Sequence, residues 1–121
     1  MATIHLTNEQ FIARVGDYRS NPGHFDFLGD KPALIDFYAD WCGPCRKLSP
    51  VLEEIAAELK GKVYIYKVNV DKEPEIANAF NIEALPTLVF LPKKGEPVAV
   101  RGFRSKESIL EKINAILLKK K

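Results

Sequence analysis

The sequence is short of the residues that usually build metal and haem sites. It has two cysteines, two histidines and one methionine among 121 residues. Acidic and basic side chains nearly balance, so the net charge of +2 provides no broad basic face for nucleic acid. No apolar run approaches the ~20 residues that span a membrane. We therefore expect neither a nucleic-acid-binding protein nor a membrane-spanning one.

The N-terminal residues also lack the features of a secretory signal. Residues 1–6 have no basic start and no apolar stretch of the usual ~7 to 15 residues. We expect a cytoplasmic protein, or a periplasmic or secreted one if a signal peptide has been removed. The length fits a single domain, residues 1–121, whose core needs no disulfide staple or metal.

Both cysteines lie in the pentapeptide Trp-Cys-Gly-Pro-Cys at residues 41–45. A Cys-x-x-Cys spacing occurs in zinc sites, in haem attachment and in dithiols that cycle with their own disulfide. Haem attachment needs a histidine where this chain has Arg46. Zinc needs further ligands at short spacing, but His5 and His24 both precede the motif. A redox dithiol, a structural disulfide and inert thiols remain, although so short a loop makes a weak staple.

Hydrophobic periodicity predicts an α/β chain with a mixed sheet. Thr7 opens a Thr-x-x-Gln capping box, and apolar residues at helical spacing extend the predicted first helix to Tyr18, before Asn-Pro-Gly at 21–23 ends it. Polar and apolar residues alternate at 24–28, which indicates a brief strand or an ordered loop. A parallel portion, an antiparallel hairpin and helices on both faces are expected. The other predicted elements are strands at 33–38, 63–70, 87–91 and 97–101 and helices at 42–59, at 73–80 and from Ser105 onward.

The dithiol falls between a buried strand and the long helix, where sites in open α/β sheets usually lie. Cys42 meets the N–H groups and the positive dipole end of the helix, which stabilise a thiolate and lower its pKa. Cys45 is shielded one turn along, with the two Cβ atoms roughly 5 to 6 Å apart, close enough for a disulfide. Gly43 and Pro44 help the chain turn into the helix.

Asp36 is the second unusual residue, because it lies in the middle of an apolar strand. Burial disfavours a carboxylate, so we expect the pKa of Asp36 to rise towards neutrality. A structural acid paired with Lys67 on the neighbouring strand is one interpretation. The adjacent dithiol favours another, in which Asp36 accepts the proton that releases Cys45 as a nucleophile.

The stretch 36–45, Asp-Phe-Tyr-Ala-Asp-Trp-Cys-Gly-Pro-Cys, with Lys-Val-Asn-Val-Asp at 67–71 and Leu-Pro-Thr at 85–87, resembles the thioredoxin family. The resemblance covers nearly the whole chain. It implies the thioredoxin fold, an α/β fold with a central mixed five-stranded sheet flanked by about four helices. It also implies a protein dithiol-disulfide oxidoreductase in which Cys42 attacks a substrate disulfide and Cys45 resolves the mixed disulfide. Asp36, with Lys67 nearby, would manage the resolving proton.

The resemblance further implies a cis peptide bond between Leu85 and Pro86, facing the cysteines. An apolar surface would then surround the dithiol and dock substrate. Its expected members are Trp41, Gly43, Pro44, Leu85, Pro86 and Gly102.

The sequence contains no nucleotide-binding glycine motif, so we expect no cofactor beyond the Cys42–Cys45 disulfide and no metal. The expected partners of a monomeric protein are disulfide-containing protein substrates and a thioredoxin reductase, a NADPH-dependent flavoprotein if the resemblance holds. Gly-Pro between the cysteines resembles reductants. A disulfide oxidant or isomerase of exported proteins, and a binding or holdase module with incidental cysteines, are the alternatives.

Two features depart from the family pattern. The segment 21–31 is longer than the usual link from the first helix to the central strand, which favours a surface elaboration over a change in partner choice. Tyr38 stands where tryptophan is common. Because tyrosine keeps the aromatic bulk, we expect little change in chemistry.

Overall fold

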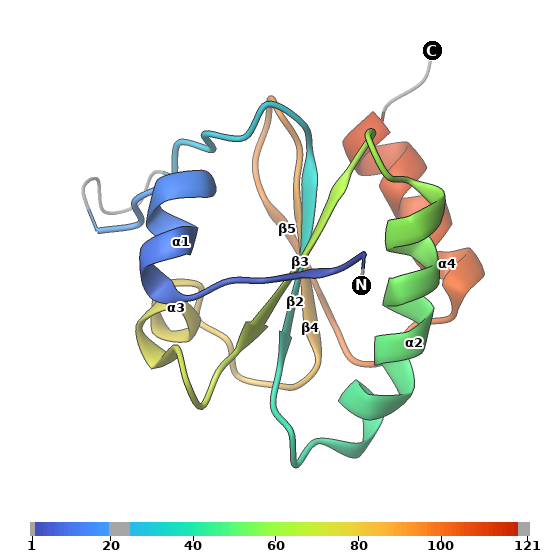
Figure 1. The fold of residues 1–121 in the computed structure, drawn as a ribbon, viewed down its shortest axis with the longest axis horizontal. Helices are drawn as coiled ribbons and strands as arrows, with labels where there is room; N and C mark the ends of the chain where they lie inside the picture. The colour runs from blue at the N-terminus through green and yellow to red at the C-terminus, as the bar shows by residue number, and fades with distance from the viewer. Residues whose placement is uncertain (1, 20–24, 119–121) are drawn as a thin grey trace.

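The computed structural model describes residues 2–19 and 25–118 (Figure 1). In chain order the elements are β1 (Ile4–His5), α1 (Asn8–Arg14), β2 (Ala33–Tyr38), α2 (Gly43–Glu58), β3 (Tyr64–Asn69), α3 (Pro74–Ala79), β4 (Thr87–Leu91), β5 (Val98–Arg101), α4 (Lys106–Lys112) and the π-helix η1 (Ile113–Leu118). The predicted strands and the two predicted helices at 42–59 and 73–80 agree with these bounds to within one residue.

The strands form one five-stranded sheet in the order β1-β3-β2-β4-β5. β1, β3 and β2 run parallel, whereas β4 pairs antiparallel with both β2 and β5. The predicted α/β fold with a mixed five-stranded sheet is therefore confirmed. β2, which leads into the dithiol, lies at the centre of the sheet.

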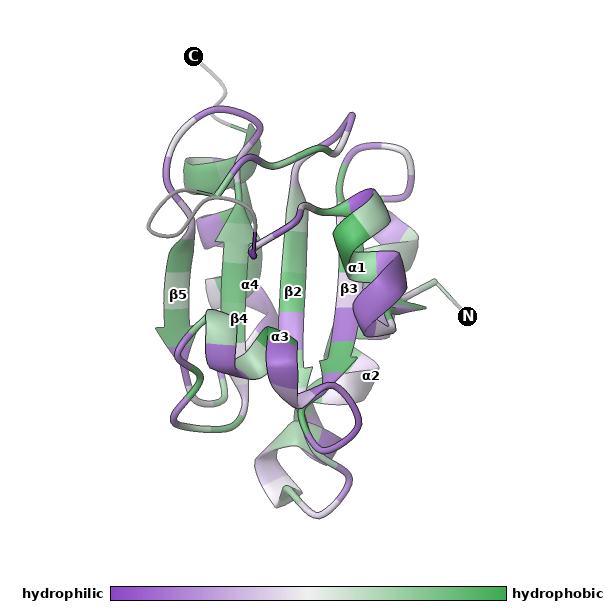
Figure 2. Ribbon diagram, turned by 90° about the vertical axis from the view of Figure 1, so that its left-hand side faces the viewer, coloured by the Kyte–Doolittle hydropathy of each residue, from purple (hydrophilic) through white to green (hydrophobic). Residues whose placement is uncertain are grey.

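Helices cover both faces of the sheet, with α1 and α3 on one side and α2 and α4 on the other (Figure 1). Successive residues of a strand point to opposite faces, so Leu34 packs in the α2 and α4 layer and Ile35 in the opposite layer. Because both faces are covered, the central strands are apolar along most of their length, as Figure 2 shows for β4. Asp36 interrupts this pattern in β2.

The first helix is shorter than predicted. Thr7 forms the expected capping box, but α1 ends at Arg14 and does not reach Tyr18. Gly16 explains the end, since a Cβ there would lie 2.7 Å from both the Asp26 carbonyl oxygen and the Phe25 ring. The returning chain packs against this point, and the Leu28 N–H donates to the Val15 carbonyl at 2.9 Å. Residues 25–28 form an ordered loop and no strand, while the predicted stop at 21–23 and residue 24 lie outside the described residues.

The last helix begins as predicted. Ser105 is the N-cap of α4, and its side chain accepts a hydrogen bond from the Ser108 N–H. The helix continues as η1, so the apolar side chains of both segments pack against the same face of the sheet. Ile109 and Ile113 are fully buried in the layer that also contains Leu34.

Candidate active site

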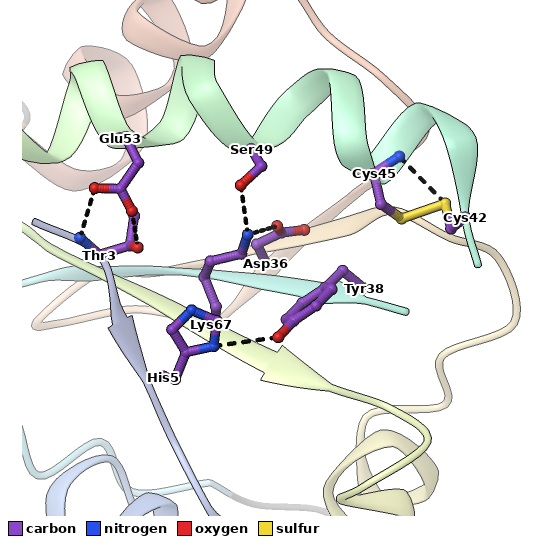
Figure 3. A network of polar contacts seen from close by, with 9 residues as sticks. All are labelled: Thr3, His5, Asp36, Tyr38, Cys42, Cys45, Ser49, Glu53 and Lys67. Atoms are coloured by element: carbon purple, nitrogen blue, oxygen red, sulfur yellow. Dashed lines mark hydrogen bonds and ion pairs between the residues drawn. A yellow bond between two sulfur atoms is a disulfide. The ribbon is translucent and has the colours of Figure 1, made fainter. Parts of the chain in front are cut away.

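The dithiol lies where β2 ends and α2 begins. Cys42 is the N-cap residue of α2, and its Sγ accepts a hydrogen bond from the Cys45 N–H at 3.2 Å. The two residues form a disulfide, with their Cα atoms 5.2 Å apart (Figure 3). N–H groups at a helix N-terminus stabilise negative charge. The position of Cys42 therefore favours a thiolate once the disulfide is reduced.

Both cysteines are largely enclosed. Cys42 is 5% exposed and Cys45 3% exposed. They cluster with Ala39, and the partly buried side chains of Tyr38 and Leu85 pack against them. Overall exposure therefore does not distinguish the two cysteines in the oxidised protein. Their difference lies in position, since only Cys42 caps the helix.

Asp36 is buried beneath α2 at the centre of the sheet (Figure 3). Neither carboxylate oxygen has a hydrogen-bond partner within the described part of the chain. Burial raises the pKa of Asp36 to about 7, although the nearby Lys67 cation acts in the opposite direction. This value agrees with the rise expected from the sequence and places the titration of Asp36 near neutrality.

Lys67 provides the cation beside Asp36. It lies opposite Asp36 in the β2–β3 register, with Nζ 3.9 Å from Oδ2. The ammonium donates a hydrogen bond to Ser49 Oγ at 2.9 Å and lies 4.5 Å from the centre of the Tyr38 ring. The Tyr38 hydroxyl is hydrogen-bonded to His5 Nδ1 at 3.1 Å (Figure 3). Ser49 and His5 were not predicted as site residues, because contacts between separate elements leave no periodic pattern in the sequence.

A hollow of about 350 Å³ lies beside Cys45. Residues from β1, β2, α2, β3 and the β2–α2 link surround it: His5, Tyr38, Ala39, Asp40, Cys45, Arg46, Ser49 and Lys67. None of the predicted docking residues belongs to this lining. Cys45 and Lys67 therefore border the same hollow.

The Leu85–Pro86 peptide bond is cis. Leu85 packs against the cysteine cluster, and the Pro86 carbonyl accepts a hydrogen bond from the Gly102 N–H at 2.8 Å. Gly102 has φ +86°, a conformation that favours glycine. These contacts bring the residues before β4 and after β5 to the same end of the sheet as the dithiol.

Large apolar side chains in the β2–α2 link and after β5 face solvent. Trp41 is 68% exposed, and its Nε1 donates a hydrogen bond to Asp71 Oδ2 at 2.9 Å. Phe103, which was not among the predicted docking residues, follows Gly102 in the chain and is 44% exposed. A Cβ built on Gly43 would meet no atom within 4 Å, so the backbone there borders open space. Tryptophan, with a large apolar ring and an N–H donor, is enriched at protein interfaces.

Within residues 2–19 and 25–118, no group of three or more histidine, cysteine, aspartate or glutamate side chains could hold a metal ion. The same ranges include no helix with the length and apolar character needed to cross a membrane.

A mixed α/β sheet with a Cys-x-x-Cys disulfide at a helix N-terminus defines a thiol-disulfide oxidoreductase. The profile of the family described as Thioredoxin matches residues 3–115. A thioredoxin of Borreliella burgdorferi is 43% identical over 105 residues, which cover 87% of this chain and 89% of that protein. A crystal structure of chloroplastic thioredoxin z superposes with a TM-score of 0.77 at 31% identity, covering 96% of this chain and 95% of that one. The chain belongs to the thioredoxin family.

A third relative joins two functions in its name. The bifunctional thioredoxin reductase/thioredoxin of Mycobacterium leprae is 34% identical over 116 residues, which cover 95% of this chain and 23% of that protein. Family membership and the Cys42–Cys45 pair make the chain a protein disulfide reductase. Its redox group is its own disulfide, and it works without a cofactor.

Proposed function

We propose that the chain reduces disulfides in other proteins through a mixed disulfide on Cys42. The Cys42 thiolate attacks one sulfur of the substrate disulfide, and the departing sulfur takes up a proton. The Cys45 thiol then gives its proton to Asp36, and the resulting thiolate attacks the sulfur of Cys42. The mixed disulfide breaks, the second substrate sulfur leaves as a thiolate, and the Cys42–Cys45 disulfide forms.

One observation carries the proposal: a helix-capping cysteine lies at the end of the strand that holds a buried carboxyl with a pKa of about 7. A general base works best when its pKa lies near the operating pH. Lys67, which flanks that carboxyl, lines the same hollow as Cys45. This arrangement supports a role for Asp36, assisted by Lys67, in handling the resolving proton.

Substrate docks in this proposal on the apolar surface that surrounds Cys42. The exposure of Trp41 and the packing of Leu85 against the cysteines support this choice. The proposed docking residues are Trp41, Gly43, Pro44, Leu85, Pro86 and Gly102.

A separate reductase returns the disulfide to the dithiol by supplying two electrons and two protons. The likeness to a protein named as both reductase and thioredoxin supports such a partner. We assign the role to a NADPH-dependent flavoprotein and propose that the chain acts as a single-domain monomer in the cytoplasm.

Insulin-disulfide reduction tests the reaction. The wild type should reduce insulin with dithiothreitol as electron donor, and the variant carrying Cys42→Ser and Cys45→Ser should not. A variant that kept full cellular function would instead favour a binding or holdase module. A redox titration against glutathione should give a midpoint near about −270 mV, the value established for the family. A midpoint near about −120 to −180 mV would favour an oxidant or isomerase.

A further inference from the structure

Ser49 lies on the face of α2 that covers the buried acid. It follows Cys45 by four residues, a spacing that places both side chains on one side of a helix. Figure 3 shows Ser49 pointing from α2 towards Lys67 and Asp36 on the strands below. The Ser49 hydroxyl therefore reaches the proton-handling groups from the same helix as the resolving cysteine.

The Lys67 ammonium has three neighbours at different distances. Ser49 Oγ accepts its hydrogen bond at 2.9 Å, Asp36 Oδ2 lies at 3.9 Å, and the centre of the Tyr38 ring lies at 4.5 Å. A buried ammonium needs polar partners, and a hydroxyl and an aromatic face both meet part of that need. Ser49 and Tyr38 thus stabilise the cation without bringing it into hydrogen-bond contact with Asp36.

Tyr38 is itself held in place from the edge of the sheet. Its hydroxyl is hydrogen-bonded to His5 Nδ1, and the two rings meet edge to face with centroids 5.9 Å apart. β1 places His5 beside Lys67 in the β1–β3 register. The aromatic face that contacts the ammonium is therefore fixed by two separate elements.

Among the described residues, Lys67 is the charged group with the largest effect on the pKa of Asp36. β3 supplies Lys67, α2 carries Ser49 and Cys45 above the acid, and β4 places Leu88 opposite it. A direct hydrogen bond from a cation stabilises a carboxylate and lowers its pKa. Asp36 lacks such a bond, so the distance of the ammonium affects how far the rise that burial causes in the pKa of Asp36 is offset.

We propose that Ser49 is a positioning residue of the exchange reaction: with the Tyr38 ring, it holds the Lys67 ammonium off Asp36, so that Asp36 can take up and release the proton of Cys45. This inference rests on the proposed function of Asp36. Without the Ser49 hydroxyl, the ammonium moves onto the carboxylate and makes Asp36 a weaker base.

Ser49→Ala tests the inference directly. Carboxyl titration of Asp36 by NMR in the oxidised protein should show a midpoint about one pH unit lower than in the wild type. At pH 6 a carboxyl with the wild-type midpoint is about one tenth ionised, and the variant should be about one half ionised. The ratio of the insulin reduction rate at pH 6 to that at pH 8 should therefore rise by up to about five-fold.

Two further variants separate positioning from general disturbance of the helix. Ser49→Thr keeps the hydroxyl and should retain the wild-type midpoint. Ser108→Ala removes a hydroxyl that accepts a bond from the Lys112 ammonium at 3.5 Å on α4, far from Asp36 in the sequence. Ser108→Ala should leave both the Asp36 titration and the rate ratio unchanged.

The outcomes distinguish this inference from the proposed function. An unchanged Asp36 midpoint in folded Ser49→Ala, or a lowered one in Ser49→Thr, overturns the positioning role. A wild type that fails to reduce insulin overturns the proposed function, and the Asp36 titration then still reports whether Ser49 holds Lys67. A lowered midpoint with an unchanged rate ratio overturns the link between Asp36 and the reaction.

Discussion

The side chains of Asp36 and Lys67 lie opposite each other on adjacent parallel strands, with Oδ2 and Nζ 3.9 Å apart and no hydrogen bond between them. Lys67 therefore offsets only part of the rise that burial causes in the pKa of Asp36. A fully hydrogen-bonded pair would hold the carboxyl ionised well below neutral pH. The looser pair leaves Asp36 able to change protonation state in the neutral range.

The stability of the oxidised protein should depend on pH through Asp36. The pKa of this group rises from 3.8 to about 7 on folding, so the unfolded chain ionises first. Stability that is present below about pH 4 is therefore lost as the pH rises to about 7, and the loss is then complete. At 1.36 kcal/mol per pKa unit, the loss is on the order of 4 kcal/mol.

Asp36→Asn should abolish this dependence. We compare the free energies of unfolding in urea at pH 4 and at pH 8. The variant should exceed the wild type by more at pH 8 than at pH 4, and the increase should be up to about 4 kcal/mol. Asp40→Asn, which changes an exposed carboxylate, is the matched control. The same stability difference at both pH values would show that Asp36 titrates normally in the folded protein.

The same variant should slow catalysis. If Asp36 accepts the proton of Cys45, Asp36→Asn should lower the rate of insulin reduction at pH 8 by about ten-fold or more. The rise in rate around pH 7 should also flatten. A wild-type rate throughout pH 6 to 9 would assign Asp36 a structural role only.

The two cysteines should behave differently as single variants. If Cys42 attacks and Cys45 resolves, Cys45→Ser keeps the attacking thiol and removes the resolving one, so substrate proteins should accumulate as disulfide-linked complexes through Cys42. Cys42→Ser should trap few partners under the same conditions. Non-reducing gels followed by mass spectrometry of the linked peptides measure both. Complexes formed mainly through Cys45 would reverse the assignment.

The Trp41–Asp71 hydrogen bond should affect docking more than chemistry. Asp71→Ala removes the acceptor for the indole N–H, so the exposed ring should become more mobile. We expect kcat/KM for a protein substrate to fall by about two- to ten-fold, mainly through KM. Asp71→Asn keeps an acceptor oxygen and should lie closer to the wild type. Fluorescence anisotropy of the chain's single tryptophan reports ring mobility independently.

Gly16 should tolerate a side chain less well than Gly61. Both have positive φ, but a Cβ on Gly61 would meet no atom within 4 Å, whereas one on Gly16 would lie 2.7 Å from a backbone oxygen. Gly61→Ala should cost about 1 kcal/mol in unfolding free energy. Gly16→Ala should cost roughly 1 to 3 kcal/mol more, since the segment at 25–26 must shift. Equal costs would show that this segment moves freely.

Local patterns were sufficient to predict most of the fold. The apolar run at 33–38 and the capping signal at Thr7 match the structure, because each depends on neighbours in the chain. The end of α1 was predicted wrongly. The helix ends shortly before Gly16, which packs closely against residues 25 and 26, and this contact with a segment ten residues further along the chain leaves no local signal. The cis Leu85–Pro86 bond came from family resemblance, since an X-Pro sequence alone favours the trans form.

The candidate site was only partly predictable for the same reason. The dithiol and Asp36 were identified because a short cysteine spacing and an acid in an apolar strand are both unusual. Ser49 and His5 are ordinary residues in ordinary elements. Their relevance comes from the packing of α2 over the sheet and of β1 beside β3, which fixes both side chains around Lys67.

The hollow beside Cys45 shares no lining residue with the proposed docking surface. If a bound substrate covers only the proposed docking residues, the hollow beside Cys45 and Lys67 stays open to solvent. In that case the pH profile of the exchange step at Cys45 should be set by this chain alone and be the same for a small disulfide as for a bulky folded protein. Selectivity among substrates and acid-base behaviour would then depend on different residues, so each could change in evolution independently.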